Sequence, residues 1–211
     1  MNRILLETKK IIKRDNLYDY LRVYPWLTGY LGDPSSKVWF LGENPSLRGI
    51  KNVHNRHPTQ TENLQWNNHD GDRLFREALT EVGFKGGQPT ENEGWYCYIT
   101  NVIKEPEIVK DRNEKKKDSN YWKKQALRWL PILQLQINNG NPFVLVAIGK
   151  AALNILTYMK LNGLKSPSLV LIPHYSYVMF RPDRKTRLGP KHPIRIKEFK
   201  DSINRIKQLY G

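Results

Sequence analysis

Cysteine is almost absent from this sequence of 211 residues, because Cys97 is the only one. A single thiol excludes a disulfide within the chain and any zinc or iron–sulfur site built from several cysteines. Cys97 lies in the stretch WYCYITN, which predicts a strand. We therefore interpret Cys97 as a small core residue and not as a nucleophile.

Long apolar runs and an excess of acidic residues are also missing. No apolar run approaches the roughly 18–20 residues that cross a bilayer, and the charged N-terminus MNRILLETKKIIKRDN lacks a signal-peptide core. We therefore expect a cytoplasmic protein without a membrane partner. The chain has 35 Lys and Arg against 20 Asp and Glu, a net charge of +15. Such an excess favours an anionic partner, and nucleic acid is the usual candidate.

Apolar runs alternate with helical patterns along the chain. The runs predict strands at residues 37–41, 95–101, 143–148 and 168–172, and the helical patterns fall at 3–30, 71–83, 119–138, 150–161 and 191–209. Unbroken apolar runs are typical of parallel strands that are buried on both faces. With right-handed crossovers, the pattern predicts a three-layer α/β/α sandwich with a central four-stranded parallel sheet. We expect residues 1–211 to form one domain, with 1–30 as an N-terminal helical segment.

Polar residues follow three of the predicted strands where each strand ends. They are Glu43, Asn44, Asn101, Lys104, His174 and Ser176. Ligands bind beyond the carboxyl ends of parallel strands, so these residues are expected at one edge of the sheet. Each alone is often a turn-stabilising side chain or a helix cap. Their occurrence together favours a catalytic site.

The motifs around these strand ends resemble those of a known family. GENPS, DGDRLFREALTEVGF, WYCYITNVIK, NPFVLVAIGKAALNIL and IPHYSY follow one another between about residues 37 and 181. In order and spacing they resemble the uracil-DNA glycosylase superfamily, most nearly its bacterial and archaeal branches with a GExPG first motif. Ser46 replaces the last glycine of that motif, Tyr175 replaces the proline of the HPS motif, and the iron–sulfur cysteines of the nearest branch are absent.

The resemblance implies a role for each residue at the strand ends. Glu43 and Asn44 would lie beside the water and the sugar, and the choice between them as the group that orients the water stays open. One branch of the family carries the glutamate and other branches carry the asparagine, whereas this sequence has both. His174 would donate to the O2 atom of the leaving base, as an oxyanion donor does. Asn101 would recognise the pyrimidine edge, and Gly42 is also expected to bind the base.

The resemblance also implies contacts to flipped-out DNA. Trp66 lies about where the nearest branch has its base-stacking phenylalanine. Side chains after the histidine would enter the vacated stack, and basic residues beyond them suit phosphates. The expected DNA contacts are Lys104, Ser176, Tyr177, Met179, Phe180, Arg181, Arg184 and Lys185. The polar stretch 47–69 holds His54 and His57 with only His69 nearby, so we expect no metal, iron–sulfur cluster or other cofactor.

Three functional interpretations stay open. The first is a monomeric, monofunctional DNA glycosylase that excises uracil or another modified pyrimidine and leaves an abasic site, as in DNA repair. No lysine occupies a family nucleophile position, so a lyase step is not expected. The second is a glycosylase for a hypermodified cytosine, such as glucosylated hydroxymethylcytosine, in anti-phage defence. The third is a binding module that kept the fold and lost catalysis.

Overall fold

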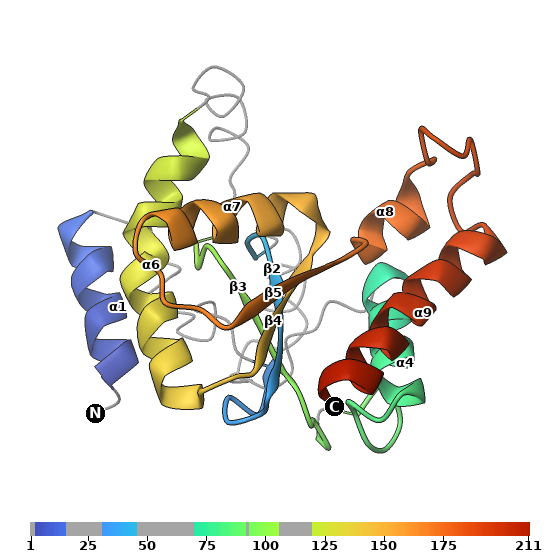
Figure 1. Cartoon of the computed structure of the whole chain (residues 1–211), viewed down its shortest axis with the longest axis horizontal. Coiled ribbons are helices and arrows are strands. Elements are labelled where there is room, and N and C mark those ends of the chain that lie inside the picture. Colours follow the sequence, from blue (N-terminus) through green and yellow to red (C-terminus); the bar gives the residue numbers. More distant parts are fainter. Residues whose placement is uncertain (1–2, 16–30, 46–69, 92, 106–119) are drawn as a thin grey trace, which may run out of the picture.

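The protein is described here by a computed structural model that covers residues 3–15, 31–45, 70–91, 93–105 and 120–211. Figure 1 shows its helices and strands. In chain order they are α1 (Arg3–Arg14), β1 (Leu31–Gly32), β2 (Val38–Gly42), α4 (Asp70–Glu81), β3 (Tyr98–Asn101), α6 (Tyr121–Gly140), β4 (Val144–Ile148), α7 (Gly149–Leu161), β5 (Ser168–Ile172), α8 (Tyr175–Phe180) and α9 (Pro193–Tyr210). The α/β class predicted from the sequence is confirmed.

The sheet has one strand more than the sequence predicts. Its order is β1-β3-β2-β4-β5. The pairs β3–β2, β2–β4 and β4–β5 are parallel, as expected. The additional strand β1 pairs antiparallel with β3, where Leu31 lies opposite Ile99. A strand of two residues is too short to show an apolar period, which is why the sequence pattern missed it.

Helices cover both faces of the sheet, so the fold has three layers (Figure 1). On one face, α1, α6 and α7 pack against Trp39 and Leu41 of β2. On the other face, α4, α8 and α9 pack against Val38 and Phe40. Successive residues of a strand point to opposite faces. Because both faces are covered, β2 is apolar throughout, which explains the unbroken apolar runs.

Two helices differ from the sequence-based prediction. The helix expected over residues 3–30 ends at Arg14, and residues 16–30 lie outside the described part of the chain. The residues after His174, expected as an inserting loop, form the short helix α8. Six residues are too few to show a helical period clearly. Among the helices that the structure describes, none is long and apolar enough to cross a membrane.

The strand order has a topological switch point between β2 and β4. The chain goes from β2 to β3 on one side of it and then returns past β2 to form β4 on the other side. The helix α4, which precedes β3, and the helix α7, which follows β4, cover opposite faces of the sheet. Ligands in open α/β sheets bind at such a switch point, outside the carboxyl ends of the strands. Here that point lies between Gly42 of β2 and Gly149, the residue that follows β4 and begins α7.

Candidate active site

Most of the polar residues expected at the strand ends lie along one edge of the sheet. The parallel register places Gly42 opposite Asn101, and Glu43 and Asn44 follow directly. On the far side of the switch point, β4 leads into α7 and β5 leads through Pro173 into His174. The order along the sheet is therefore the amide of Asn101, the carboxylate and amide after β2, and then the imidazole.

His174 has a defined tautomer in this structure. It is the N-cap of α8, and its Nδ1 accepts a hydrogen bond from the backbone N–H of Ser176 at 3.1 Å. A backbone N–H can only donate, so Nδ1 carries no proton. The imidazole is then neutral with its proton on Nε2. The cap thus leaves the N–H donor of the ring at Nε2.

Gly149 lets His174 approach the end of β4. Its φ of +86° lies in the region that favours glycine. A Cβ at this position would lie 2.9 Å from the Cβ of His174 and 3.2 Å from its Cδ2. Gly149, in the Gly-Lys turn after β4, therefore leaves the space that the His174 side chain occupies. The sequence motif did not indicate this role.

Gly42 makes similar room for Asn101. A Cβ on Gly42 would lie 2.6 Å from the Oδ1 of Asn101. Two backbone bonds extend the pairing beyond the strands: Val102 N–H donates to Gly42 O at 2.8 Å, and Ile103 N–H donates to Glu43 O at 2.9 Å. The turns after β2 and β3 are thereby tied together, so the carboxylate of Glu43 and the amide of Asn101 share one framework.

The comparison with protein families agrees with this arrangement. The family model for the Uracil DNA glycosylase superfamily matches residues 29–196. The chain belongs to this superfamily. Its members are generally hydrolytic glycosylases that act on DNA. The helix α1 precedes the matched region. A search of curated proteins finds no significant match.

Tyr175 occupies the place of the proline in the superfamily's HPS motif. Its ring stacks on Phe75 of α4, with centroids 5.3 Å apart and planes 13° apart. Its phenol hydrogen-bonds the buried Asp72, and burial, reinforced by that carboxylate, raises the pKa of the phenol well above its usual range. The tyrosine therefore fastens the segment that carries His174 to α4.

Lys104 differs from the sequence-based prediction. We expected a DNA contact, but its side chain is fully buried. Its Nζ donates to Thr100 Oγ1 at 2.8 Å and to the carbonyl oxygen of Asn101 at 2.5 Å. Burial lowers the pKa of the amine to about 7. A buried amine cannot reach a phosphate, so we replace the expected DNA contact with support of the Asn101 backbone.

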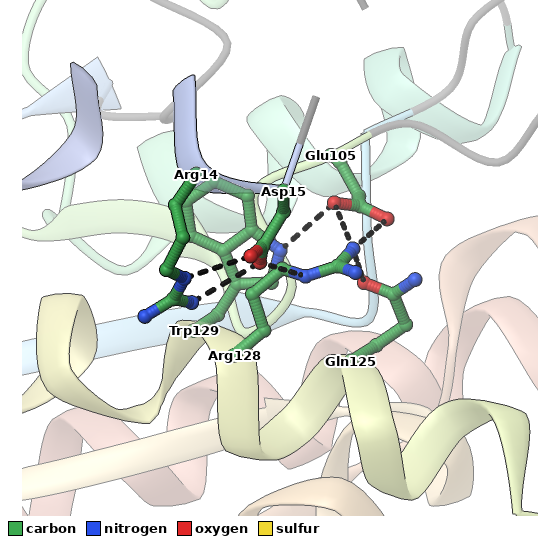
Figure 2. Close-up of polar contacts among 6 residues, drawn as sticks. All are labelled: Arg14, Asp15, Glu105, Gln125, Arg128 and Trp129. Carbon is green, nitrogen blue, oxygen red and sulfur yellow. Dashed lines mark hydrogen bonds and ion pairs between the residues drawn. The ribbon is translucent and has the colours of Figure 1, made fainter. Parts of the chain in front are cut away.

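Glu105, the next residue, is held by side chains of α6 (Figure 2). The Nη1 of Arg128 in α6 donates to both carboxylate oxygens, at 3.1 and 3.0 Å, and the indole of Trp129 donates at 3.3 Å. The Nε of Arg128 pairs with Asp15, just after α1, at 2.7 Å. Burial raises the pKa of Glu105, and Arg128 partly opposes that rise. Because these partners lie far apart in sequence, no local motif indicated them.

The segment after His174 presents aromatic and basic groups to solvent. Tyr177 is 61% exposed and Phe180 is 50% exposed, whereas Val178 is buried and Met179 packs partly against the core. The expected phosphate contacts Arg181, Arg184 and Lys185 are exposed. Two aromatics of the predicted wedge thus point outward, and Met179 is turned largely inward.

Several predictions fall outside the described residues. They concern Ser46, Trp66 and the histidines of the polar stretch, His54, His57 and His69. Within the described ranges, no group of three or more His, Cys, Asp or Glu side chains is placed to hold a metal ion.

Proposed function

We propose that this protein is a monofunctional DNA glycosylase. It flips a uracil or another modified pyrimidine out of the DNA and hydrolyses the N-glycosidic bond, leaving an abasic site. The observation that carries the proposal is the neutral His174, held by its cap as an Nε2–H donor at the edge where ligands of this fold bind. Membership of the superfamily supports the same chemistry.

His174 stabilises the leaving base. Cleavage of the N-glycosidic bond puts negative charge on the base, chiefly on O2, and positive charge on the sugar. A fixed donor aimed at the developing anion lowers the barrier, and losing one such donor costs about 10²–10³-fold in rate. The ring needs no reorganisation, because the Ser176 amide already fixes its tautomer.

Glu43 and Asn44 serve the sugar side of the reaction. A carboxylate close to C1′ favours the oxocarbenium-like sugar and takes a proton from the attacking water. The amide of Asn44 can orient that water, since it both donates and accepts. Asn101 uses the same capacity to recognise the pyrimidine edge, supported from behind by Lys104.

The segment after His174 engages the DNA. Extruding a base costs a few kcal/mol of stacking and pairing. The exposed rings of Tyr177 and Phe180 fill the vacated stack, as apolar wedges do in other proteins that distort DNA. Arg181, Arg184 and Lys185 contact the phosphates. Trp66 stacks on the extruded base.

The test compares two histidines that make the same capping bond. His174→Asn keeps an oxygen that accepts from the Ser176 N–H, because Asn is a good N-cap, but removes the Nε2 donor. His192 caps α9 in the same way, accepting from Ile194 N–H at 3.3 Å. We expect His174→Asn to slow single-turnover base release about 10²–10³-fold and His192→Asn to leave it near the wild-type rate.

The substrate panel contains uracil opposite guanine, adenine and no partner, thymine opposite guanine, and hydroxymethylated and glucosylated cytosine. Release of uracil supports the proposal in its simplest form. Release of a modified cytosine alone supports the more specialised glycosylase. Equal rates for the wild type and His174→Asn on every substrate that is cleaved would contradict the role of His174.

A further inference from the structure

Arg195 is a buried cation at an unfavourable place in its helix. It lies in the first turn of α9, where the positive end of the helix dipole disfavours a guanidinium. It is nevertheless only 7% exposed. The sequence pattern did not single it out, because an arginine in a basic segment is normally predicted to lie on the surface. Its retention in the interior needs partners that offset its burial.

The partners are three backbone carbonyls of one neighbouring segment. Nη1 donates to the oxygens of Arg181 at 2.5 Å and Gly189 at 2.9 Å, and Nη2 donates to the oxygen of Tyr177 at 2.8 Å. The side chain of Asp183 supplies a further favourable charge. The guanidinium fork thus joins α8 and both ends of the following loop to α9. In Figure 1 this loop connects the two helices and extends beyond them.

The loop between Arg181 and Lys191 is also closed internally. Asp183 Oδ1 accepts from the N–H groups of Lys185 at 2.7 Å and Thr186 at 2.8 Å, and Lys191 N–H donates to Val178 O at 3.0 Å. With its backbone bonded inward, the loop leaves the side chains of its basic residues exposed. The fork of Arg195 bonds this unit to the start of α9, in addition to the apolar packing of α8 against that helix.

We propose that Arg195 is a positioning residue for the DNA-binding segment 177–189. It holds the wedge residues Tyr177 and Phe180 and the basic side chains in their DNA-binding arrangement before DNA arrives. Such preorganisation removes part of the ordering cost of binding. Arg195 itself does not contact phosphate, because its donors face carbonyl oxygens and its surface is buried. This inference rests on the proposed DNA contacts of this segment, but not on base release.

Three variants separate positioning from charge. Arg195→Lys keeps the charge but replaces the planar fork with one ammonium, which cannot serve three spread carbonyls equally. Arg195→Gln removes both the charge and the fork. Lys197→Gln is the matched control: it removes one charge from the same helix at an exposed side chain that pairs only with Asp201 in the described contacts.

The measurement is the affinity for a duplex that carries a non-cleavable uracil analogue, over a range of salt concentrations, with 2-aminopurine next to the lesion to report flipping. We expect Arg195→Lys and Arg195→Gln to lose affinity roughly tenfold and to lower the flipping signal. We expect the salt dependence of binding in Arg195→Gln to fall by more than the one phosphate contact that its lost charge could explain, and to fall in Arg195→Lys although that variant loses no charge. Lys197→Gln should stay close to the wild type in affinity and flipping.

The outcomes are distinct. Wild-type behaviour of Arg195→Lys would overturn the inference, because charge alone would then suffice. Unfolding of both Arg195 variants would also overturn it, because the residue would serve global stability. Binding that responds as expected in a protein that releases no base would refute the proposed reaction and keep this inference. Base release by a protein whose DNA binding does not change in the Arg195 variants would support the proposed reaction and refute this inference.

Discussion

Gly149→Ala tests how closely catalysis depends on the placement of His174. At a φ of +86°, a residue with a Cβ costs about 1–2 kcal/mol in backbone energy. The new Cβ would also lie 2.9 Å from the Cβ of His174, inside the 3.4 Å at which ordinary contacts begin. Because the obstacle is the root of the side chain and not a flexible end, the histidine must move by about half an ångström.

The expected effect on rate follows from that movement. A misplacement of about 1 Å in an active site can cost 10²-fold in rate. For half that movement we expect base release to slow about tenfold. Because the backbone strain lies in a turn, the free energy of unfolding should fall by only about 1–2 kcal/mol, and the variant should remain folded.

Gly163→Ala provides the matched control. Gly149 begins α7, and Gly163 follows the C-terminal end of that helix. Gly163 also has a positive φ, +101°, but a Cβ there would meet nothing within 4 Å. Urea unfolding and single-turnover base release are measured for both variants. Both should lose similar stability, and only Gly149→Ala should lose rate. Equal rates in the two variants would refute the claim that Gly149 places the imidazole.

Three further changes test the supports around the site. Arg128→Met should lower the free energy of unfolding by about 2–3 kcal/mol in urea titration. This is less than the roughly 3–5 kcal/mol typical of a broken buried ion pair, because Arg128 is 24% exposed. Adding Glu105→Gln should restore part of the lost stability. Burial lowers the pKa of Lys104 from 10.5 in the unfolded chain to about 7 in the folded protein. Between these pH values the unfolded chain binds one proton more, so the free energy of unfolding of the wild type should rise from about pH 7 to pH 10. Lys104→Met should lack this part of the rise. Tyr175→Phe should keep the ring stack but leave Asp72 without the phenol, which lowers stability by about 1–3 kcal/mol in thermal unfolding.

Much of the fold is predictable because local patterns specify it. The apolar runs of β2, β4 and β5 are long enough to be recognised, and β2 and β4 are buried where the helices pack on both faces, whereas β5 is largely half-buried or exposed. The added strand β1 is only two residues long and exists because it pairs with β3. The helix α8 depends on a cap by the His174 side chain, which has no strong precedent in capping preferences. Both features depend on tertiary or side-chain contacts, and no periodic pattern of apolar residues in the sequence indicates them.

The supports of the candidate site are harder to predict than its polar groups. Glu43, Asn101 and His174 could be singled out because they follow strands of a parallel sheet. Lys104 was misassigned, because a lysine after a strand is normally solvated and only the tertiary structure buries this one. The pairing of Glu105 with Arg128 spans 23 positions and no sequence period connects them.

The products of one reaction distinguish a glycosylase from a protein that only binds DNA. The wild-type protein is incubated in excess with a uracil-containing duplex, and free base, abasic sites and intact strands are quantified by mass spectrometry and alkaline cleavage, with borohydride present in a parallel sample. The proposed hydrolysis should give free base and abasic sites in equal amounts, strands intact until alkali is added, and no covalent adduct trapped by borohydride. Salt-dependent DNA binding without free base from uracil or any other member of the panel would contradict it.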